Sequence, residues 1–563
     1  MQITPDCVDP LYAAPIIDAE SDESSPAPHH RVSGHFEGTN IQFTIYLPPA
    51  DAFEGRFFQY TYPVVFAPAT STALADDRAI GFALASGGYA VQAGNASVAL
   101  GYRHTAAAAK FAEQFAAEYY GWDQEIFGYL FGPSGGSFQT VGAAENTSEV
   151  WDGFMPLVLG TPMSNPYDFT VRAAAALILS DKADQISDAV LPGGSGDPFA
   201  GLDAGEAAML EELLAFGTPL QGWENPQYLL GLPGGLSGFL PPVGANAYVD
   251  AFWNAEGYLG TEDSPLGDAV RAALATLGDT PENRADIASR FSYRHQLPAP
   301  DSGYVGFDQF RDESGDPLYP QIAPVWGPIF TGGVGGNTAW DGSIDGKMMV
   351  LDNLYDVDAL PYHADWYSQR VEASLGSEFP DRFRVYYTDH ADHLDAPVES
   401  ERARYLINWY GAVEQALRDL AAWVEDGVAP PASTQYEVQD GQVVVPDDAD
   451  ERLGLQPTVD LTVRGGDMVA VKAGQQVVFQ ADVEAPPGTG VIVATAWDFE
   501  GDGTYSEQAV PHPRTELHTQ ARHRFETPGV YFVALRVTSQ RDGVESLFAQ
   551  VQNLDRVRVV VTP

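Results

Sequence analysis

A serine flanked by glycines is the clearest candidate for a nucleophile in the sequence. Residues 132–136 read Gly-Pro-Ser-Gly-Gly, the one G-x-S-x-G pattern in the chain. It follows the apolar segment EIFGYLF (125–131) and precedes a predicted helix, which is the strand–turn–helix setting of a nucleophile elbow. Such a sharp turn requires small residues two positions either side of the serine, and Gly132 and Gly136 meet this need. We therefore predict that Ser134 attacks a carbonyl carbon; the alternative is a glycine-rich loop beside a helix.

An acid that could orient a catalytic base follows a later predicted strand. A serine hydroxyl needs a base to take its proton, and the base needs an acid beside it. Hydrolases with an elbow place these in the order Ser, Asp or Glu, His. Asp356 and Asp358 both follow the apolar segment KMMVLDNL (347–354). Asp356 is preferred because it is nearer the end of the strand, and Asp358 is the alternative.

The base is predicted after the next strand. FRVYY (383–387) is followed by Thr-Asp-His-Ala-Asp-His, which contains His390 and His393. A few loop residues are needed for the imidazole to fold back onto Ser134, so His393 is preferred and His390 is the alternative.

The oxyanion hole would use backbone N–H groups. One is expected from Gly135, directly after the nucleophile, and a second from Thr61 in the loop after an early strand. Tyr60 and Tyr62 are predicted to line the acyl pocket, although aromatic residues beside a strand are more often part of a core.

Parallel α/β structure is predicted around these residues, because short apolar runs alternate with helical segments. The expected strands are 41–47, 57–66, 89–92, 125–131, 154–160, 347–354 and 383–387, and the expected helices are 76–88, 104–119, 362–376 and 398–425. Helical stretches separated by glycine-rich loops interrupt this rhythm, which indicates an inserted cap (lid) domain. The predicted division is an N-terminal extension (1–32), an α/β-hydrolase core (33–160 and 341–428), a cap (161–340), a linker (429–454) and a C-terminal domain (455–563).

The C-terminal domain is expected to be an all-β, immunoglobulin-like sandwich, because short strands alternate with turns. AWDFEGDGT (496–504) and HRFETPGVYFVALRV (523–537) resemble the two signature stretches of polycystic kidney disease (PKD) domains. The resemblance implies a domain found mainly in extracellular proteins and frequently attached to secreted hydrolases. Asp498, Glu500 and Asp502 alternate like calcium ligands, but they are also the turn signature of such domains. We expect no metal and no cofactor.

Four stretches near the elbow match a known family. They are GRFFQ (55–59), the helix with Lys110 that runs into Tyr119-Tyr120-Gly121, the Ser134 elbow itself, and Trp151-Asp152-Gly153. They resemble the tannase and feruloyl esterase family of α/β-hydrolases, in which an Asp and a His follow a large inserted lid. That family typically carries cysteines, joined by a disulfide, just before the nucleophile and just after the His. Pro133 and Leu394 stand at these places, and Cys7 is the single cysteine. The resemblance implies an esterase and leaves its substrate open.

The composition excludes several other classes of protein. The 563 residues carry 78 Asp and Glu against 29 Lys and Arg, a formal charge of −49. Repulsion from phosphates argues against nucleic acid as a partner. The hydrophobic content of 45% fits a chain that buries a core. No apolar run reaches the roughly 18 residues of a membrane span.

The charge and the first residues bear on the environment in which the protein works. The four lysines are Lys110, Lys182, Lys347 and Lys472. An acidic, lysine-poor surface fits a halophilic protein, and equally a protein from a GC-rich genome. Residues 1–30 lack a signal peptide, so the protein is either cytosolic or a mature form to which Met1 was added. The resemblance to PKD domains favours the second, and we expect a secreted protein.

Three functions fit these observations. The leading one is a secreted serine esterase acting on a small-molecule or polymeric carboxylic ester, including aromatic, plant-derived or polyester substrates. The second is a serine peptidase of the α/β-hydrolase fold. The third is a non-catalytic extracellular binding protein on a hydrolase scaffold. The Ser, Asp, His order argues against the third.

Overall fold

A mixed β-sheet forms the centre of the molecule. The structure is a computed structural model that describes residues 2–62, 77–94, 101–236, 245–394, 397–541 and 547–563. Within these ranges the sheet has nine strands in the order β1-β2-β3-β5-β4-β6-β7-β8-β9. β1, β2 and β3 pair antiparallel, and the strands from β5 to β9 pair parallel. The strands are β1 (Pro15–Glu23), β2 (His29–Phe36), β3 (Gln42–Leu47), β4 (Arg56–Tyr60), β5 (Gly88–Gly94), β6 (Phe127–Ser134), β7 (Gly153–Leu159), β8 (Lys347–Asn353) and β9 (Phe383–Thr388).

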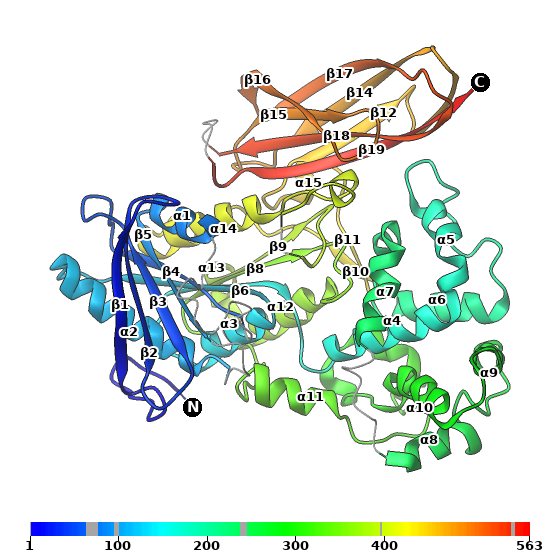
Figure 1. Cartoon of the computed structure of the whole chain (residues 1–563), viewed down its shortest axis with the longest axis horizontal. Helices are drawn as coiled ribbons and strands as arrows, with labels where there is room; N and C mark the ends of the chain where they lie inside the picture. The colour runs from blue at the N-terminus through cyan, green and yellow to red at the C-terminus, as the bar shows by residue number, and fades with distance from the viewer. Residues whose placement is uncertain (1, 63–76, 95–100, 237–244, 395–396, 542–546) are drawn as a thin grey trace.

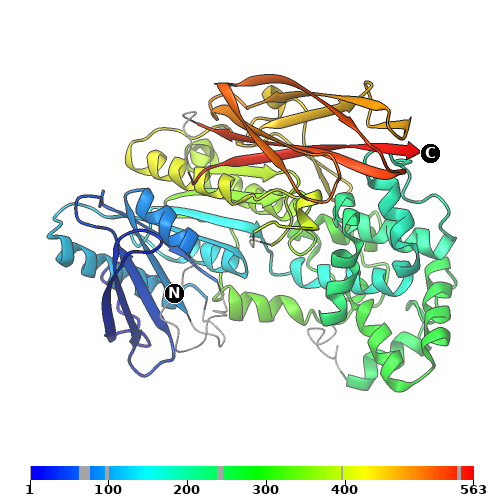
Figure 2. The same ribbon diagram turned by 45° about the horizontal axis from the view of Figure 1, so that its top comes forward.

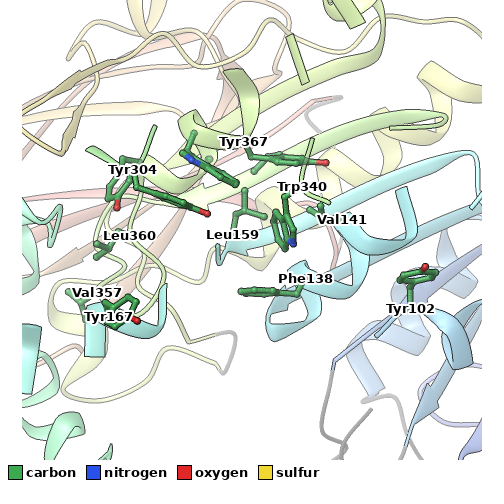
Figure 3. Packing of buried hydrophobic residues seen from close by; sticks show 14 of the residues in the cluster. Tyr102, Phe138, Val141, Leu159, Tyr167, Tyr304, Trp340, Val357, Leu360 and Tyr367 are labelled. Atoms are coloured by element: carbon green, nitrogen blue, oxygen red, sulfur yellow. The ribbon is translucent and has the colours of Figure 1, made fainter. Parts of the chain in front are cut away.

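Helices cover both faces of this sheet, which is why its central strands are apolar throughout. One face packs against α1 (Asp77–Ala85) and α14 (Tyr410–Glu425). The other packs against α2 (Arg103–Tyr120), α3 (Gly135–Asn146) and α12 (Tyr362–Leu375). In Figure 3 the ring of Phe138 from α3 lies near Trp340, and their centroids are 5.1 Å apart. The helix that begins at the candidate nucleophile is therefore anchored in a dense aromatic core.

The N-terminal residues differ from the prediction. Residues 1–32 are not an extension, because they supply β1 and part of β2 to the central sheet. β1 (PIIDAESDE) is an edge strand with mostly exposed side chains, so it lacks the alternating apolar pattern by which strands are recognised.

The segment before the last core helix also differs. A helix was expected from 398, but α14 begins at Tyr410, and residues 399–409 form turns and a short 3₁₀ helix at Arg402–Arg404. The N–H of Ile407 donates to the carbonyl of His390, at 2.8 Å. The turns therefore pack against the loop after β9 that carries His390 and His393, which we call the histidine loop. The end of the strand predicted at 57–66 lies largely outside the described residues, and β4 ends at Tyr60.

The described residues between β7 and β8 contain helices and no strand of the sheet. The α-helices are α4 (Asn165–Leu179), α5 (Ala183–Val190), α6 (Ala204–Ala215), α7 (Pro226–Leu236), α8 (Ala245–Asn254), α9 (Pro265–Leu277), α10 (Pro281–Arg290) and α11 (Trp326–Ile329). Several begin at side-chain caps: Asp203 and Glu206 form a capping box, and Ser264 and Thr280 each accept from a backbone N–H. We call this segment the cap. Figure 1 shows α4–α10 gathered at one end of the sheet, whereas α11 lies apart from them, below the sheet, and Figure 2 shows the same segment in a second view.

The C-terminal strands form a two-sheet sandwich that lies along the core, over α14 and the short helix α15, Ala449–Arg452 (Figure 1). One sheet has the order β12-β14-β17 and the other β13-β19-β18-β15-β16. The strands are β12 (Thr458–Val463), β13 (Met468–Lys472), β14 (Gln476–Glu484), β15 (Val491–Asp498), β16 (Ser506–Arg514), β17 (Glu516–Arg524), β18 (Gly529–Gln540) and β19 (Val551–Thr562). The segment expected to be a linker holds a small hairpin, β10 (Glu437–Gln439) and β11 (Gln442–Val444), and α15 (Ala449–Arg452).

Candidate active site

Ser134 occupies a strained turn between β6 and α3. Its φ of 55° and ψ of −119° are rare for a residue with a side chain. A Cβ on Gly132 would lie 2.2 Å from the carbonyl oxygen of Thr61, and one on Gly136 would lie 2.1 Å from the same oxygen. The two glycines are thus required because the end of β4 packs directly against the turn. The backbone has the geometry of a nucleophile elbow.

Gly135 is the first residue of α3, so its N–H has no carbonyl acceptor within the helix. It lies at the positive end of the helix, where a developing oxyanion is stabilised. Thr61 does not suit the second donor position, which corrects our expectation. Its N–H donates to the carbonyl of Phe131 at 2.9 Å, because Thr61 extends the β4–β6 ladder by one residue. The Thr61 hydroxyl instead hydrogen-bonds the Gln139 side chain and so ties β4 to α3.

Asp356 and His393 form a buried pair. The Nδ1 of His393 lies 2.7 Å from the Oδ2 of Asp356. The Asp356 side chain is fully buried, and that of His393 is 12% exposed. The other Asp356 oxygen accepts from the N–H groups of Asp358 and Ala359, at 2.7 and 2.8 Å. These two bonds fix the carboxylate so that its remaining oxygen points at the imidazole.

The charge of this pair raises the pKa of His393. Burial alone would lower that pKa, but the Asp356 carboxylate, its hydrogen bond and the nearby charges of Asp358 and Asp392 raise it to about 9. Burial in turn raises the pKa of Asp356, and the His393 imidazolium opposes that rise. The pair therefore favours a protonated imidazole, the form that the histidine takes after it accepts the serine proton.

The two alternative residues have other partners. The Asp358 carboxylate is bound by Arg172 and by the hydroxyl of Tyr228. The Nδ1 of His390 lies 3.2 Å from the Oδ1 of Asn553, in the C-terminal sandwich. Thus His393 contacts Asp356 and not Asp358, and His390 contacts the neighbouring domain.

The loop that carries His393 is held by polar contacts of its neighbours Asp392 and Leu394. Asp392 accepts from Arg402 at 2.7 Å and from the N–H of Leu394 at 3.1 Å. Its carbonyl accepts from the side chain of Asn353 at 2.7 Å, and the indole of Trp409 donates to the carbonyl of Leu394 at 3.1 Å. We had not predicted a role for Asp392, although it lies within the Asp-His-Ala-Asp-His motif.

Ser134 is the last residue of β6, and Asp356 and His393 follow β8 and β9. The parallel pairing of these strands through β7 brings their carboxyl ends to one edge of the sheet. Of the two predicted pocket residues, Tyr60 packs edge-to-face on Phe131, with ring centroids 5.6 Å apart. Tyr62 is half-buried. This ring contact packs Tyr60 against the buried core on one face of the sheet.

The residues that carried the family resemblance have structural partners. The amine of Lys110 donates to the carbonyl of Thr4 at 2.9 Å, and the indole of Trp151 donates to the side chain of Gln59 at 3.0 Å. Lys110 thus ties α2 to the N-terminal segment, and Trp151 belongs to the buried core on the face of the sheet that α2 and α3 cover.

The possible calcium loop forms an ordinary turn. Both oxygens of Asp498 accept backbone N–H groups, from Gly501 and Gly503, at 2.8 Å each. In the part of the chain that the structure describes, no group of three or more His, Cys, Asp or Glu is arranged to hold a metal. Within the same residues, no helix has the length and apolarity to cross a membrane.

The strand order, the elbow and the Asp–His pair after later strands define an α/β-hydrolase fold with a C-terminal sandwich. Residues 460–551 match the PKD domain family. A comparison with curated protein sequences finds no match.

Similar solved structures include three fungal esterases, each 12% identical to this chain. They are "Tannin acyl hydrolase from Aspergillus niger" (TM-score 0.37, covering 79% of this chain and 87% of that one), feruloyl esterase B from Aspergillus oryzae (0.34, 76% and 89%) and an esterase from Aspergillus oryzae (0.36, 74% and 84%). The resemblance to tannases and feruloyl esterases that the sequence indicates is therefore also found among solved structures.

Proposed function

We propose that the chain is a secreted serine esterase. Ser134 attacks the carbonyl carbon of a carboxylic ester while His393 takes its proton, and Asp356 orients the imidazole and stabilises its charged form. The N–H of Gly135 donates to the oxyanion. His393 then protonates the departing alcohol, and a water molecule activated by the same imidazole hydrolyses the acyl-enzyme.

The observation that carries this proposal is the hydrogen bond between His393 and Asp356, at the same edge of the sheet as Ser134. The 2.7 Å bond to Nδ1 leaves the Nε2 nitrogen of the ring for the nucleophile. The strained backbone of Ser134 supports the same role, because strain of this kind is maintained only where the surrounding structure enforces it.

The direct test is Ser134→Ala, assayed with short p-nitrophenyl esters. We expect turnover to fall by about 10³-fold or more, because the nucleophile and base act as a unit. Ser314→Ala is the matched control, since Ser314 is exposed on the cap, and it should retain parental activity. Undiminished ester turnover in Ser134→Ala would refute the assignment.

The substrate class needs a separate measurement. A panel of esters graded by acyl length, with aromatic and polymeric members, would identify the preferred acyl group. Aminoacyl anilides belong in the same panel: hydrolysis of the anilides without hydrolysis of the esters would replace the esterase with a peptidase.

A further inference from the structure

Arg172, on cap helix α4, reaches the loop that carries the candidate catalytic acid. Its side chain is fully buried. Nη1 donates to the carbonyl of Val357 at 3.0 Å and also binds the carboxylate of Asp358. Nε donates to the carbonyl of Leu229 at 2.9 Å, and Nη2 to that of Tyr228 at 3.1 Å. One guanidinium thus joins two cap helices, α4 and α7, to the segment after β8.

Asp358 continues this connection to the acid. Its carboxylate lies between Arg172 and the hydroxyl of Tyr228, and its N–H donates to the Oδ1 of Asp356 at 2.7 Å. The opposite oxygen of Asp356 contacts His393. The backbone geometry that Arg172 fixes is therefore the geometry that presents Asp356 to the imidazole.

We propose that Arg172 and Asp358 are positioning residues through which the cap controls the catalytic histidine. This inference rests on the proposed function. Its consequence is that the cap shapes the loop after β8 that carries Asp356 and Asp358, which we call the acid loop. Any displacement of α4 or α7 would therefore alter the Asp356–His393 pair.

The charges around His393 make the role of Arg172 and Asp358 measurable in the pH dependence of activity. His393 is hydrogen-bonded to Asp356, and it interacts electrostatically with the carboxylates of Asp358 and Asp392 and with the buried Asp352. Asp392 is itself paired with Arg402. Burial would raise the pKa of Asp358, but Arg172, together with His393 and the Tyr228 hydroxyl, lowers it.

Loss of Arg172 therefore favours the neutral form of Asp358, because a buried carboxylate without its partner takes up a proton. His393 then loses the negative charge of Asp358, which is one of those that hold its pKa up. This loss outweighs the loss of the Arg172 cation, because that cation acts on His393 less strongly. Two effects follow: the alignment of Asp356 is impaired, and the imidazole becomes less basic.

The experiment compares the pH dependence of kcat/KM in the full-length parent enzyme, Arg172→Met and Asp358→Asn. We expect the plateau to fall by about 10- to 100-fold in both variants, because the base is misaligned. We also expect the acid limb of the profile to move to lower pH. Asp358→Asn keeps the shape of the side chain, so it remains informative if Arg172→Met does not fold.

Arg294→Met is the matched control. Arg294 is also a buried cap arginine, 6% exposed and paired with Glu212. Its other partners in the described part of the chain, Glu262 and Tyr319, also lie in the cap and away from the acid loop. We expect Arg294→Met to leave the acid limb at its parental pH. Arg172→Lys keeps the charge, so its limb should also stay in place while its plateau falls.

An acid limb that is unchanged in both Arg172→Met and Asp358→Asn would overturn the inference. Ser134→Ala separates this from failure of the proposed function. If Ser134→Ala stays active, the esterase assignment falls. If activity depends on Ser134 while the limb does not move, only the role of Arg172 and Asp358 falls.

Discussion

Two neighbouring carboxylates take different roles because of what surrounds them. Asp356 and Asp358 are both buried and both near His393. Asp356 accepts two backbone N–H groups and contacts the imidazole, whereas Asp358 forms an ion pair with the guanidinium of Arg172. The carboxylate that accepts the imidazole N–H directly is the one that can orient the ring and stabilise its charged form.

The pKa of His393 predicts an alkaline enzyme. The imidazole must be neutral to accept the proton of Ser134, and its pKa in the free enzyme is raised to about 9. We expect kcat/KM to rise tenfold per pH unit on the acid side and to level off above about pH 9. A profile already flat at pH 7 would contradict this.

Deprotonation of His393, which is expected to raise activity, is also expected to lower the free energy of unfolding. Because the folded pKa of His393 lies above its ordinary value of roughly 6.5, the ion pair contributes fully below that pH. Its contribution is then lost as the pH rises through about 9. The enzyme is thus expected to be most active where this pair contributes least to folding.

At the residue scale, the sequence predicts the order of the three candidate catalytic residues, but it does not decide between adjacent candidates such as Asp356 and Asp358. The order of Ser134, Asp356 and His393 could be predicted, since each follows a recognisable strand. What separates Asp356 from Asp358 is Arg172, which lies in a distant helix of the cap. Likewise, Thr61 could not be excluded as an oxyanion donor until its N–H was seen to extend the strand pairing.

At the scale of elements, the histidine loop depends on an ion pair. Arg402 binds Asp392, whose side chain is 9% exposed. We expect Arg402→Met to lower kcat about tenfold and the free energy of unfolding by about 1–3 kcal/mol, because a buried carboxylate loses its partner.

Arg404→Met provides the control for that loop. Arg404 pairs with Glu401, and their side chains are 43% and 76% exposed. Exposed pairs of this kind contribute little, so the change should be within about 0.5 kcal/mol. Equal effects of the two substitutions would show that the Asp392 pair has no special role.

Elements with strong apolar patterns could be predicted, and those without could not. β6, β7, β8 and β9 have mostly buried side chains and were found near their predicted bounds. β1 was missed because it is polar and exposed at the edge of the sheet. Residues 399–409 were predicted as the start of the last core helix, but they form turns that pack against the histidine loop instead.

At the scale of the whole molecule, negative charge converges where the domains meet. A cavity of about 760 Å³ lies between the core, the cap, the linker and the sandwich. Its lining includes the acidic residues Glu224, Asp389, Asp447, Asp448, Asp460, Asp467, Asp482, Glu484 and Asp555, and the basic residues His390, Arg452 and Arg556. Burial and the charges of Asp482, Asp467 and Asp447 raise the pKa of Asp460, which indicates that these carboxylates repel one another.

This arrangement predicts stabilisation by salt. Screening weakens the repulsion, so Tm should rise between low salt and molar NaCl, and activity should hold or rise. Asp460→Asn should raise Tm at low salt and reduce the gain from NaCl. Glu507→Gln, an exposed change on β16, should do neither. If Tm and activity fall in molar NaCl, genome composition better explains the acidic surface.

The close packing of the sandwich on the core constrains how this protein can be engineered. Arg541 and Arg556, both from the sandwich, neutralise Asp419 of α14 and Glu224 of the cap. A Cβ on Gly411 would lie 1.7 Å from the carbonyl oxygen of Gln550. A version truncated before β12 would leave two buried acids without their cations, so the minimal catalyst extends through the last strand. Domain exchange with other esterases would have to transplant both sides of this junction together.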